Sequence, residues 1–281
     1  MLEFVLGLVD SRMPSMRMRC FSVGATFFLA GCAFAATPQD TKNPTEQSAS
    51  RAEHKISNCA TQKHAQIDYV VCRFDPEEAD IRLFLNDAEG QPYGHFTRLK
   101  AALQERGESL IFAMNGGMYH KDRSPVGFYV ENEIVHKKEN TNDGPGNFHM
   151  KPNGVFIIDG NGFWVAPTST FLVSNRPPPI YATQSGPMLV IDGELHPRFL
   201  VDSDSRKRRN GVGVTEAGEV IFVLADTPVN FYQFAVFFRD ELKTPNALYL
   251  DGTISRVYAP EVGRNDPGAA MGPIIGVVAK Q

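Results

Sequence analysis

The sequence lacks an excess of positive charge and lacks any long hydrophobic run. Its 28 Lys and Arg residues are outnumbered by 32 Asp and Glu residues, which gives a formal net charge of −4 at pH 7. General nucleic-acid-binding proteins carry a basic excess, so nucleic acid is not an expected partner. The apolar run from Phe21 to Ala30 has roughly 10 residues, whereas a helix needs about 20 to cross a bilayer. A permanent transmembrane helix is therefore not expected.

Familiar catalytic signatures are also missing. The sequence contains no Gly-x-Ser-x-Gly nucleophile elbow, no Walker loop and no His-Glu-x-x-His zinc motif. Asp202 and Asp204 resemble the start of a calcium loop, but the glycine and the closing Glu are absent at the required offsets. We expect neither a metal ion nor a cofactor.

The first 36 residues have the layout of a secretion signal, because Arg17 and Arg19 precede the apolar run and small residues follow it. Two processing routes are open. The segment 29–32, Leu-Ala-Gly-Cys, resembles the lipobox of bacterial lipoproteins, in which Cys32 becomes the lipidated first residue. Cleavage after Ala35 satisfies the rule for ordinary signal removal instead. The remaining alternative is a buried N-terminal helix that contains an incidental cysteine.

A polar segment follows the leader. Residues 37–55 contain few apolar side chains and are predicted to be a flexible tether, and residues 56–281 are predicted to be one domain. Only Cys59 and Cys72 remain in that domain, and in an oxidising compartment such a pair favours a disulfide. The expected location is the periplasm, or the envelope membrane if Cys32 carries a lipid, which would be the only membrane contact.

Turn residues at short intervals predict an α+β fold of antiparallel, hairpin-rich sheets with a few covering helices in a single globular domain. Asn, Asp and Gly between apolar runs supply the backbone conformations of tight hairpins. The predicted strand and turn segments are 127–136, 154–166, 188–193 and 212–224. Apolar side chains recur on one helical face from Phe96 to Arg106 and from Phe231 to Leu242, with Asn230 as N-cap of the second helix.

Strings of polar residues and glycine stand at the ends of apolar strands. The first is Asn115-Gly116-Gly117, where glycine allows a ligand to approach the backbone, although a simple glycine turn has the same pattern. Similar strings occur at 146–154, 182–188, 206–213 and 251–253. Several of them are expected to converge at one edge of a sheet. The basic run 206–209 is either a solvated loop or the source of a guanidinium, whose planar donors match phosphate oxygens.

Taken in order, the segments FAMNGGMY, SPVGFYV, GNFHMKPNGVF, ATQSGPMLVIDG, RNGVGV and LYLDG resemble the phosphodiester glycosidase family, and in particular its bacterial periplasmic branch. The best-known activity of this family is that of an N-acetylglucosamine-1-phosphodiester alpha-N-acetylglucosaminidase. The resemblance extends from Ile67 to Val278. It implies an exported hydrolase that cleaves a sugar-1-phosphodiester, between the anomeric carbon and a phosphate oxygen, in an envelope polymer or exopolysaccharide.

The resemblance also implies site residues. Positions that match the family pattern are Asn115, Gly116, Gln184, Ser185, Gly186, Arg209 and Asp251. The family often continues its last motif with a second glycine, whereas this chain has Thr253-Ile254-Ser255. Because of that departure, the sequence does not predict the shape of the pocket around Asp251 or the identity of the substrate.

The chemistry of the bond assigns roles to these residues. Phosphate is a good leaving group, so holding its negative charge matters more than a strong general acid. The predicted catalytic residues are Arg209 on the phosphate, Asn115, and Asp251, which activates water or stabilises an oxocarbenium-like transition state. Bracing its own turn is the alternative role of Asp251. The predicted substrate-binding residues supply backbone amides and further donors: Gly116, Gly117, Lys151, Gln184, Ser185, Gly186, Arg208, Asn210 and Gly252.

Glycosidases ordinarily use two carboxylates, and the sequence does not identify the second one. The candidates near the polar strings are Asp143, Asp192 and Asp226. The histidines near these strings are more typical of loop or packed residues than of general bases: His120, His136 and His149. The alternative function is a non-catalytic lipoprotein on the same fold that binds a glycan or phosphoglycan. A sugar-phosphate or glycan is the expected partner in both cases.

Overall fold

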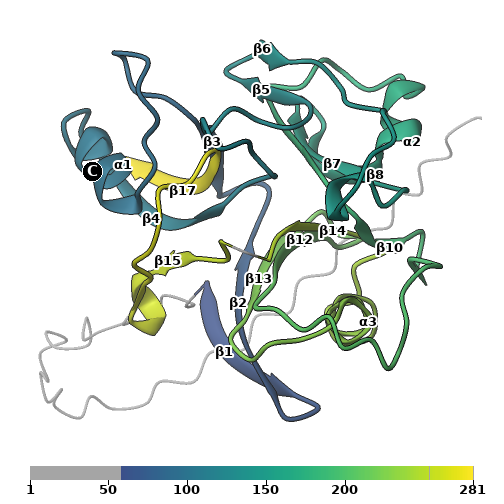
Figure 1. The fold of residues 1–281 in the computed structure, drawn as a ribbon. Coiled ribbons are helices and arrows are strands. Elements are labelled where there is room, and N and C mark those ends of the chain that lie inside the picture. Colours follow the sequence, from purple (N-terminus) through teal and green to yellow (C-terminus); the bar gives the residue numbers. More distant parts are fainter. Residues whose placement is uncertain (1–57, 253, 281) are drawn as a thin grey trace, which may run out of the picture. The chain divides into compact units, whose positions relative to one another are not determined.

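The computed structural model describes residues 58–252 and 254–280. The predicted leader, the tether and the lipidation site Cys32 lie outside the described residues. No helix within the described part is long and apolar enough to cross a membrane. The described domain has the predicted α+β architecture, with three antiparallel sheets and few helices (Figure 1).

The three sheets are named here after one strand of each. The β12 sheet has seven strands in the order β1 (Cys59–His64), β2 (Ile67–Phe74), β13 (Val220–Ala225), β12 (Asn210–Val214), β14 (Asn246–Asp251), β10 (Met188–Ile191) and β11 (Glu194–Leu195). The β4 sheet has the order β16 (Arg264–Asn265), β15 (Val257–Ala259), β4 (Glu108–Asn115), β17 (Ile274–Lys280) and β3 (Asp80–Phe84). The β9 sheet has the order β6 (Ile134–Lys137), β5 (Tyr129–Glu131), β9 (Tyr181–Ser185), β7 (Gly154–Asp159) and β8 (Gly162–Pro167).

The predicted hairpins are confirmed. β5 pairs with β6, β7 with β8, β10 with β11 and β12 with β13, each in antiparallel register. In the β5–β6 turn, Asn132 and Glu133 have φ angles of 52° and 66°. This left-handed conformation suits Asn and matches the right-handed twist of the flanking strands. The turn chemistry therefore identified these strands correctly.

Both predicted helices are present, with different ends. α1 (Phe96–Gln104) buries the expected face of Phe96, Leu99 and Leu103. α3 (Phe231–Val236) begins at the capping box of Asn230 and continues as a π-helical segment, η2 (Phe237–Glu241), instead of one uniform helix. Further short helices were not predicted, because five residues or fewer carry little periodic signal: α2 (Thr168–Leu172), η1 (Asn147–His149) and η3 (Pro260–Val262).

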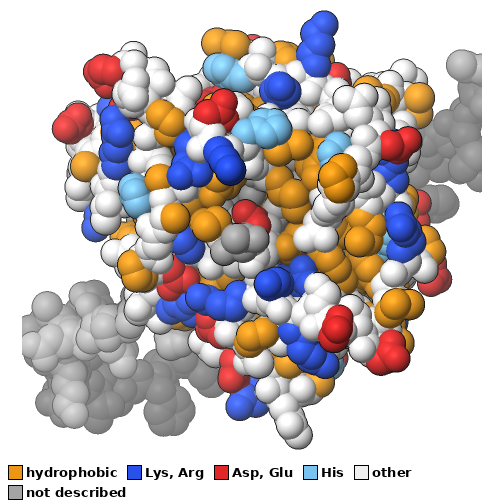
Figure 2. Space-filling model, in the orientation of Figure 1, with side chains coloured by type: hydrophobic (Ala, Val, Ile, Leu, Met, Phe, Trp, Pro, Cys, Tyr) orange, Lys and Arg blue, Asp and Glu red, His pale blue; other side chains and the backbone are white. Residues whose placement is uncertain are grey.

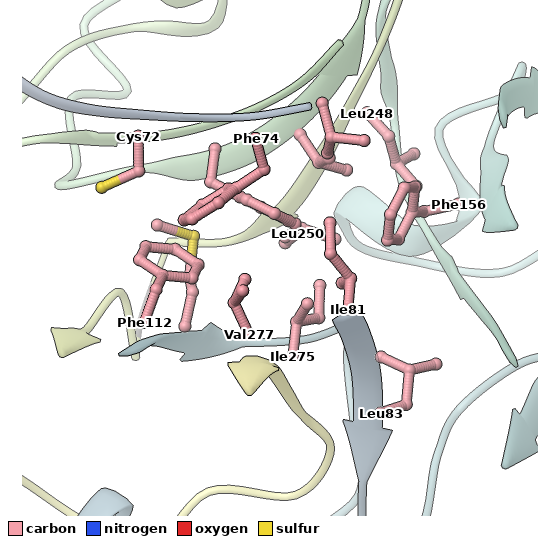
Figure 3. Packing of buried hydrophobic residues seen from close by; sticks show 14 of the residues in the cluster. Cys72, Phe74, Ile81, Leu83, Phe112, Phe156, Leu248, Leu250, Ile275 and Val277 are labelled. Atoms are coloured by element: carbon pink, nitrogen blue, oxygen red, sulfur yellow. The ribbon is translucent and has the colours of Figure 1, made fainter. Parts of the chain in front are cut away.

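The largest hydrophobic core lies between the three sheets (Figure 3). Phe222 of β13 packs against Phe112 of β4 at 5.1 Å and against Phe156 of β7 at 5.9 Å between ring centroids. Aromatic pairs at such distances add to the free energy gained by burying their surface. Because one cluster contains side chains of all three sheets, the sheets hold one another in place.

The predicted disulfide is confirmed. Cys59 and Cys72 face each other in the register of β1 and β2 and are covalently joined. Closing the loop between two residues that are 13 positions apart restricts the unfolded chain. The bond fixes the β1 edge of the β12 sheet.

The predicted polar strings do converge, at a place where strands of all three sheets end. β4 ends at Asn115, β9 ends at Ser185, β12 begins at Asn210 and β14 ends at Asp251. Hydrogen bonds join Asn115 to Asn210 and Ser185 to the carbonyl group of Leu250. Segments far apart in the sequence therefore form one candidate site.

Candidate active site

Two fully buried asparagines connect the β4 sheet to the β12 sheet. The Nδ2 of Asn115 donates to the Oδ1 of Asn210 at 3.3 Å, and the Nδ2 of Asn210 donates to the Oδ1 and carbonyl oxygen of Asn115 at 3.1 and 3.2 Å. The Oδ1 of Asn115 also accepts from the backbone N–H of Arg256 at 3.0 Å. Buried amides with partners stabilise a unique arrangement. Both amides thus position the strand ends.

The backbone of Asp251 is hydrogen-bonded to this asparagine pair. Its backbone N–H donates to the Oδ1 of Asn210 at 2.9 Å, and the hydroxyl of Ser255 donates to its carbonyl oxygen at 2.8 Å. The carboxylate accepts from the N–H of Gly252 at 2.5 Å. Asp251 is partly exposed, unlike the asparagines beneath it. The turn therefore holds a carboxylate at the surface of a rigid base, and Asp251 also braces its own turn.

The two glycines after Asn115 contact protein, which differs from the predicted role of their amides. The N–H of Gly116 donates to the carbonyl oxygen of Pro273 at 2.7 Å, and that of Gly117 donates to the Oγ1 of Thr183 at 3.1 Å. A Cβ on Gly117 would lie 2.4 Å from the carbonyl oxygen of Gln184. Gly117 permits a close approach to the backbone, as the sequence indicates, but the group that approaches it is strand β9 and not a ligand. These two amides are therefore not assigned to the phosphate.

The segment Gln184-Ser185-Gly186 is also built into the protein. The Oε1 of Gln184 accepts from two backbone N–H groups, and its Nε2 donates to Asn140 and Thr168. Ser185 donates to the carbonyl oxygen of Leu250 at 2.8 Å. A Cβ on Gly186 would lie 2.7 Å from the carbonyl oxygen of Phe148. These predicted substrate-binding residues support the Asp251 turn from the side of the β9 sheet.

Arg209 is buried to 1% exposure beside this frame. Its Nε donates to the carbonyl oxygen of Val229 at 2.9 Å and its Nη2 to that of Ser205 at 2.8 Å. The guanidinium stacks on the ring of Phe231 at 3.7 Å, and its Nη1 makes no hydrogen bond of good geometry, although Tyr249 lies beside it. Burial lowers the pKa of Arg209 from its ordinary value, and interaction with the neighbouring Tyr249 opposes that effect. The Nη1 donor of this fixed guanidinium is therefore available to a ligand.

Arg208, the preceding residue, belongs to an ion-pair network. Its Nη2 lies 2.9 Å from Asp226 and 3.6 Å from Asp266. Arg264 bonds to the same two carboxylates, at 2.7 and 2.9 Å. Asp226, one of the candidates for a second catalytic carboxylate, is thus engaged by two arginines. The Nε of Arg208 is buried without a partner.

Other predicted residues have partners of their own. Lys151 donates to Asp143 at 2.7 Å and to the carbonyl oxygen of Thr141 at 2.6 Å, and it lines a cavity of about 250 Å³. The charge of Lys151 lowers the pKa of Asp143. Asp192 accepts from Asn246 at 3.3 Å. No described group of His, Cys, Asp and Glu is arranged to hold a metal.

Three residues that neighbour the Asp251 turn in the sheet or through electrostatic interaction each carry a buried donor without a well-formed hydrogen bond. Five buried side-chain polar atoms in the described residues lack a hydrogen bond, and three of them are Arg208 Nε, Arg209 Nη1 and the hydroxyl of Tyr119. The Tyr119 hydroxyl interacts electrostatically with Asp251, and burial raises its pKa. A Cβ on Gly252 would lie 3.6 Å from the carbonyl oxygen of Arg208. Since an unpaired buried donor is costly, such a cluster indicates a place for a ligand.

Sequence reasoning missed two aromatic residues of the site. Tyr119 ends the segment FAMNGGMY and Tyr249 lies in the segment LYLDG, but the sequence pattern assigns a role to neither. The hydroxyl of Tyr249 would lie 2.1 Å from a Cβ on Gly252, so it packs directly beneath the turn. Tyr249 also lies beside Arg209, whose guanidinium carbon is 5.4 Å from its ring centroid. The sequence did contain a signal for Tyr249. Side chains two residues apart on a strand point to the same face of the sheet, so Tyr249 is expected on the same face as Asp251.

Comparisons with known proteins identify a family and a fold. A family model described as phosphodiester glycosidase matches residues 108–278. YigE, an uncharacterised protein of Escherichia coli K12, is 35% identical over 184 residues, which are 66% of this chain and 71% of that protein. The auto-inhibited catalytic domain of zebrafish N-acetylglucosamine-1-phosphodiester alpha-N-acetylglucosaminidase has a similar fold, with a TM-score of 0.53, 14% identity and coverage of 78% of this chain and 81% of that chain.

Two further solved structures share the fold. A hypothetical protein from Synechocystis gives a TM-score of 0.53 at 14% identity, covering 79% of this chain and 61% of that chain. A protein of Burkholderia pseudomallei K96243 that is predicted to be exported gives 0.50 at 12% identity, covering 75% and 74%. At such identities the likeness concerns the fold. The family match includes Asn115, Arg209 and Asp251.

Proposed function

Because the chain belongs to the phosphodiester glycosidase family, we propose that it is a hydrolase that cleaves a sugar-1-phosphodiester between the anomeric carbon and a phosphate oxygen. The observation that carries this proposal is the set of unpaired buried donors on Arg208, Arg209 and Tyr119 around a partly exposed carboxylate. A phosphodiester is an acceptor with negative charge, and it needs such donors. An envelope polymer or exopolysaccharide is the proposed source of the substrate.

In the proposed reaction, one residue accepts a proton and others stabilise the leaving phosphate. A water oxygen bonds to the anomeric carbon, and the bond from that carbon to the phosphate oxygen breaks with its electron pair leaving on the phosphate. Asp251 accepts the proton of the attacking water. Arg209, with help from Arg208 and Tyr119, holds the phosphate charge as it increases. The products are a free sugar and a phosphate monoester.

Asn115 and Asn210 act through position in this scheme. Their amides bond to each other and to the backbone of Asp251 and Arg256, so they fix the carboxylate relative to the donors. Misplacement of a reacting group by about 1 Å can cost roughly 100-fold in rate. Asn115 is therefore proposed as a positioning residue, and Gln184 and Ser185 have the same role from the β9 sheet.

The direct test measures release of free sugar from the methyl diester of α-N-acetylglucosamine-1-phosphate by the purified full chain. Turnover is expected for the natural sequence, with a loss on the order of 10²-fold or more in Asp251→Asn and Arg209→Gln. Asp80→Asn is the matched control, because this exposed carboxylate pairs with Arg82 and was assigned no role in the site. Binding of the diester without release of sugar would favour the non-catalytic glycan-binding function.

We further propose that the chain works outside the cytoplasm. The Cys59–Cys72 disulfide and the likeness to a protein predicted to be exported support this location, together with the leader sequence. Mass spectrometry of the mature N-terminus distinguishes the two routes. A lipidated Cys32 identifies an anchored lipoprotein, and a mature chain that begins at Ala36 identifies a free periplasmic protein. An unprocessed N-terminus in the cytoplasmic fraction would contradict both.

A further inference from the structure

A second hollow in the described domain lies over the β5–β6 hairpin and carries basic side chains. Its volume is about 430 Å³. The chemistry-bearing residues that line it are His120, His136, Lys137, Lys138, Glu139 and Asn140. Figure 2 shows His side chains and side chains that are Lys or Arg in the region of β5 and β6, on the same face as a separate hollow near the middle of the molecule. The 430 Å³ hollow at His136 and Lys137 is termed the basic pocket.

The basic pocket has a local excess of positive charge, although the chain as a whole has a net charge of −4. Two lysines and a single carboxylate, that of Glu139, line the pocket together with two histidines. Within residues 58–252 and 254–280, Lys137 and Lys138 form no ion pair, whereas Lys151 bonds to Asp143. Exposed lysines without partners attract anions by charge, in a way that added salt weakens.

The walls of the basic pocket are fixed by the same residues that support the Asp251 turn. Gln184 exchanges hydrogen bonds with the backbone of Asn140 at 2.9 Å in both directions, and the next residue, Ser185, bonds to the carbonyl oxygen of Leu250. The Nδ2 of Asn140 donates to the carbonyl oxygen of Val126 at 3.1 Å. One strand, β9, therefore braces the basic pocket and the Asp251 turn together.

The chain between the two sites is short. His120 lines the basic pocket, and the residue before it, Tyr119, interacts electrostatically with Asp251. His120 is five positions after Asn115, so at most about 18 Å of chain joins them. A ligand that has one phosphate at the Asp251 turn and further anionic groups along its length can reach the basic pocket.

We propose that the basic pocket binds a second phosphate of the same substrate molecule, so that the substrate class is a glycan with repeated phosphodiester groups rather than a single small diester. This inference rests on the function proposed above. A membrane surface is the other source of phosphodiester anions, because Ile134 and Val135 of β6 are exposed to 61% and 55%. A concave site braced by β9 fits an extended chain that enters it better than a flat bilayer.

The test compares a trimer of N-acetylglucosamine-1-phosphate units, linked by phosphodiesters, with the methyl diester of one unit, using the full chain. The natural sequence is expected to show a higher kcat/KM for the trimer. In the double variant K137E/K138E, the ratio of the two kcat/KM values falls about tenfold, mainly through a higher KM for the trimer. Raising the salt concentration lowers the ratio of the natural sequence toward that of the variant.

The matched control is K63E/K243E, which makes the same change of charge at two exposed lysines outside the basic pocket. An unchanged ratio in K137E/K138E, or an equal fall in the control, would overturn the inference while the proposed function stands. Absence of turnover of both substrates would contradict the proposed function instead. Calorimetric binding of the trimer, lost only in K137E/K138E, would then still support the basic pocket.

Anionic phospholipid vesicles provide the last arm of the experiment. Vesicles that contain phosphatidylglycerol are not expected to retain the chain through Lys137 and Lys138 when lipid-modified protein is excluded by Cys32→Ser. Vesicle binding that K137E/K138E abolishes, with no preference for the trimer, would overturn the inference in favour of a membrane surface.

Discussion

Two groups of polar side chains meet at the Asp251 turn, and they differ in how their hydrogen bonds are used. In the asparagine frame, formed by Asn115 and Asn210, the side-chain amides bond to each other and to backbone groups of three strand ends. In the donor group, formed by Arg208, Arg209 and Tyr119, each side chain has one buried donor without a partner. The frame is complete without a ligand, and the donor group is not.

This difference separates stability from function. A fully paired network favours the folded protein, and removing one member leaves the others unpaired. Unpaired buried donors lower the stability of the free protein and are retained where a ligand completes them. We therefore expect changes in the frame to reduce mainly the free energy of unfolding, and changes in the donor group to reduce mainly turnover.

The largest effect is expected from the two neighbouring arginines. In the natural protein the planar guanidinium of Arg209 bonds to Val229 through Nε and keeps Nη1 available for a ligand. Arg209→Lys keeps the positive charge but loses this planar group, so kcat/KM should fall on the order of 100-fold. Arg208→Lys should cost about tenfold, because Asp226 and Asp266 already share its charge. Sugar release from the methyl diester measures both. Equal losses in the two variants would remove the distinction between them.

The frame is tested by Asn210→Ala. Its amide joins Asn115 to the backbone of Asp251, so the change leaves several buried groups unpaired and should lower the free energy of unfolding by about 3 kcal/mol. Urea unfolding followed by circular dichroism gives this value. Asn161→Ala, at an exposed turn residue, is the control and should change stability by less than about 0.5 kcal/mol. A small effect at Asn210 would show that the frame does not carry the stability assigned to it.

Local features of this fold could be predicted from sequence, and the two groups at the turn could not. Hairpins follow from turn residues next to one another, and the α1 and α3 faces follow from periodic apolar side chains. The asparagine pair joins positions 95 residues apart, and no local pattern indicates such a contact. Arg208 and Arg209 look alike in sequence, yet only Arg209 is buried on Phe231. The glycines of the first string were informative about close approach, but the pattern does not say whether protein or ligand approaches.

A smaller effect is expected at Gly252, the residue after Asp251, where it packs on Tyr249. A Cβ on Gly252 would lie 2.1 Å from the hydroxyl oxygen of Tyr249, so Gly252→Ala should cost about 2 kcal/mol of stability through overpacking. Tyr249→Phe removes that oxygen and should recover about half of the loss in the double variant, since the next ring atom would be 3.3 Å away. A double-mutant cycle in urea measures the coupling. Strict additivity of the two changes would contradict the contact.

The smallest effect on stability is expected from Tyr119→Phe. The Tyr119 hydroxyl makes no hydrogen bond of good geometry and has the backbone of Gly272 near it, so its removal should change the free energy of unfolding by less than about 1 kcal/mol. Burial raises the pKa of this hydroxyl, which keeps it a proton donor at neutral pH. Its loss should therefore lower kcat/KM by about tenfold or less.

Tyr181→Phe is the matched control for this change. Its hydroxyl is also on a largely buried tyrosine, but it donates to the Oδ1 of Asn132 at 2.6 Å, away from the Asp251 turn. Removing it should cost about 1 kcal/mol of stability and leave turnover intact. The two tyrosines thus give opposite signatures for the same chemical change. If Tyr119→Phe lost stability and kept its turnover, the donor group would be part of the frame, and a ligand would no longer be needed to explain it.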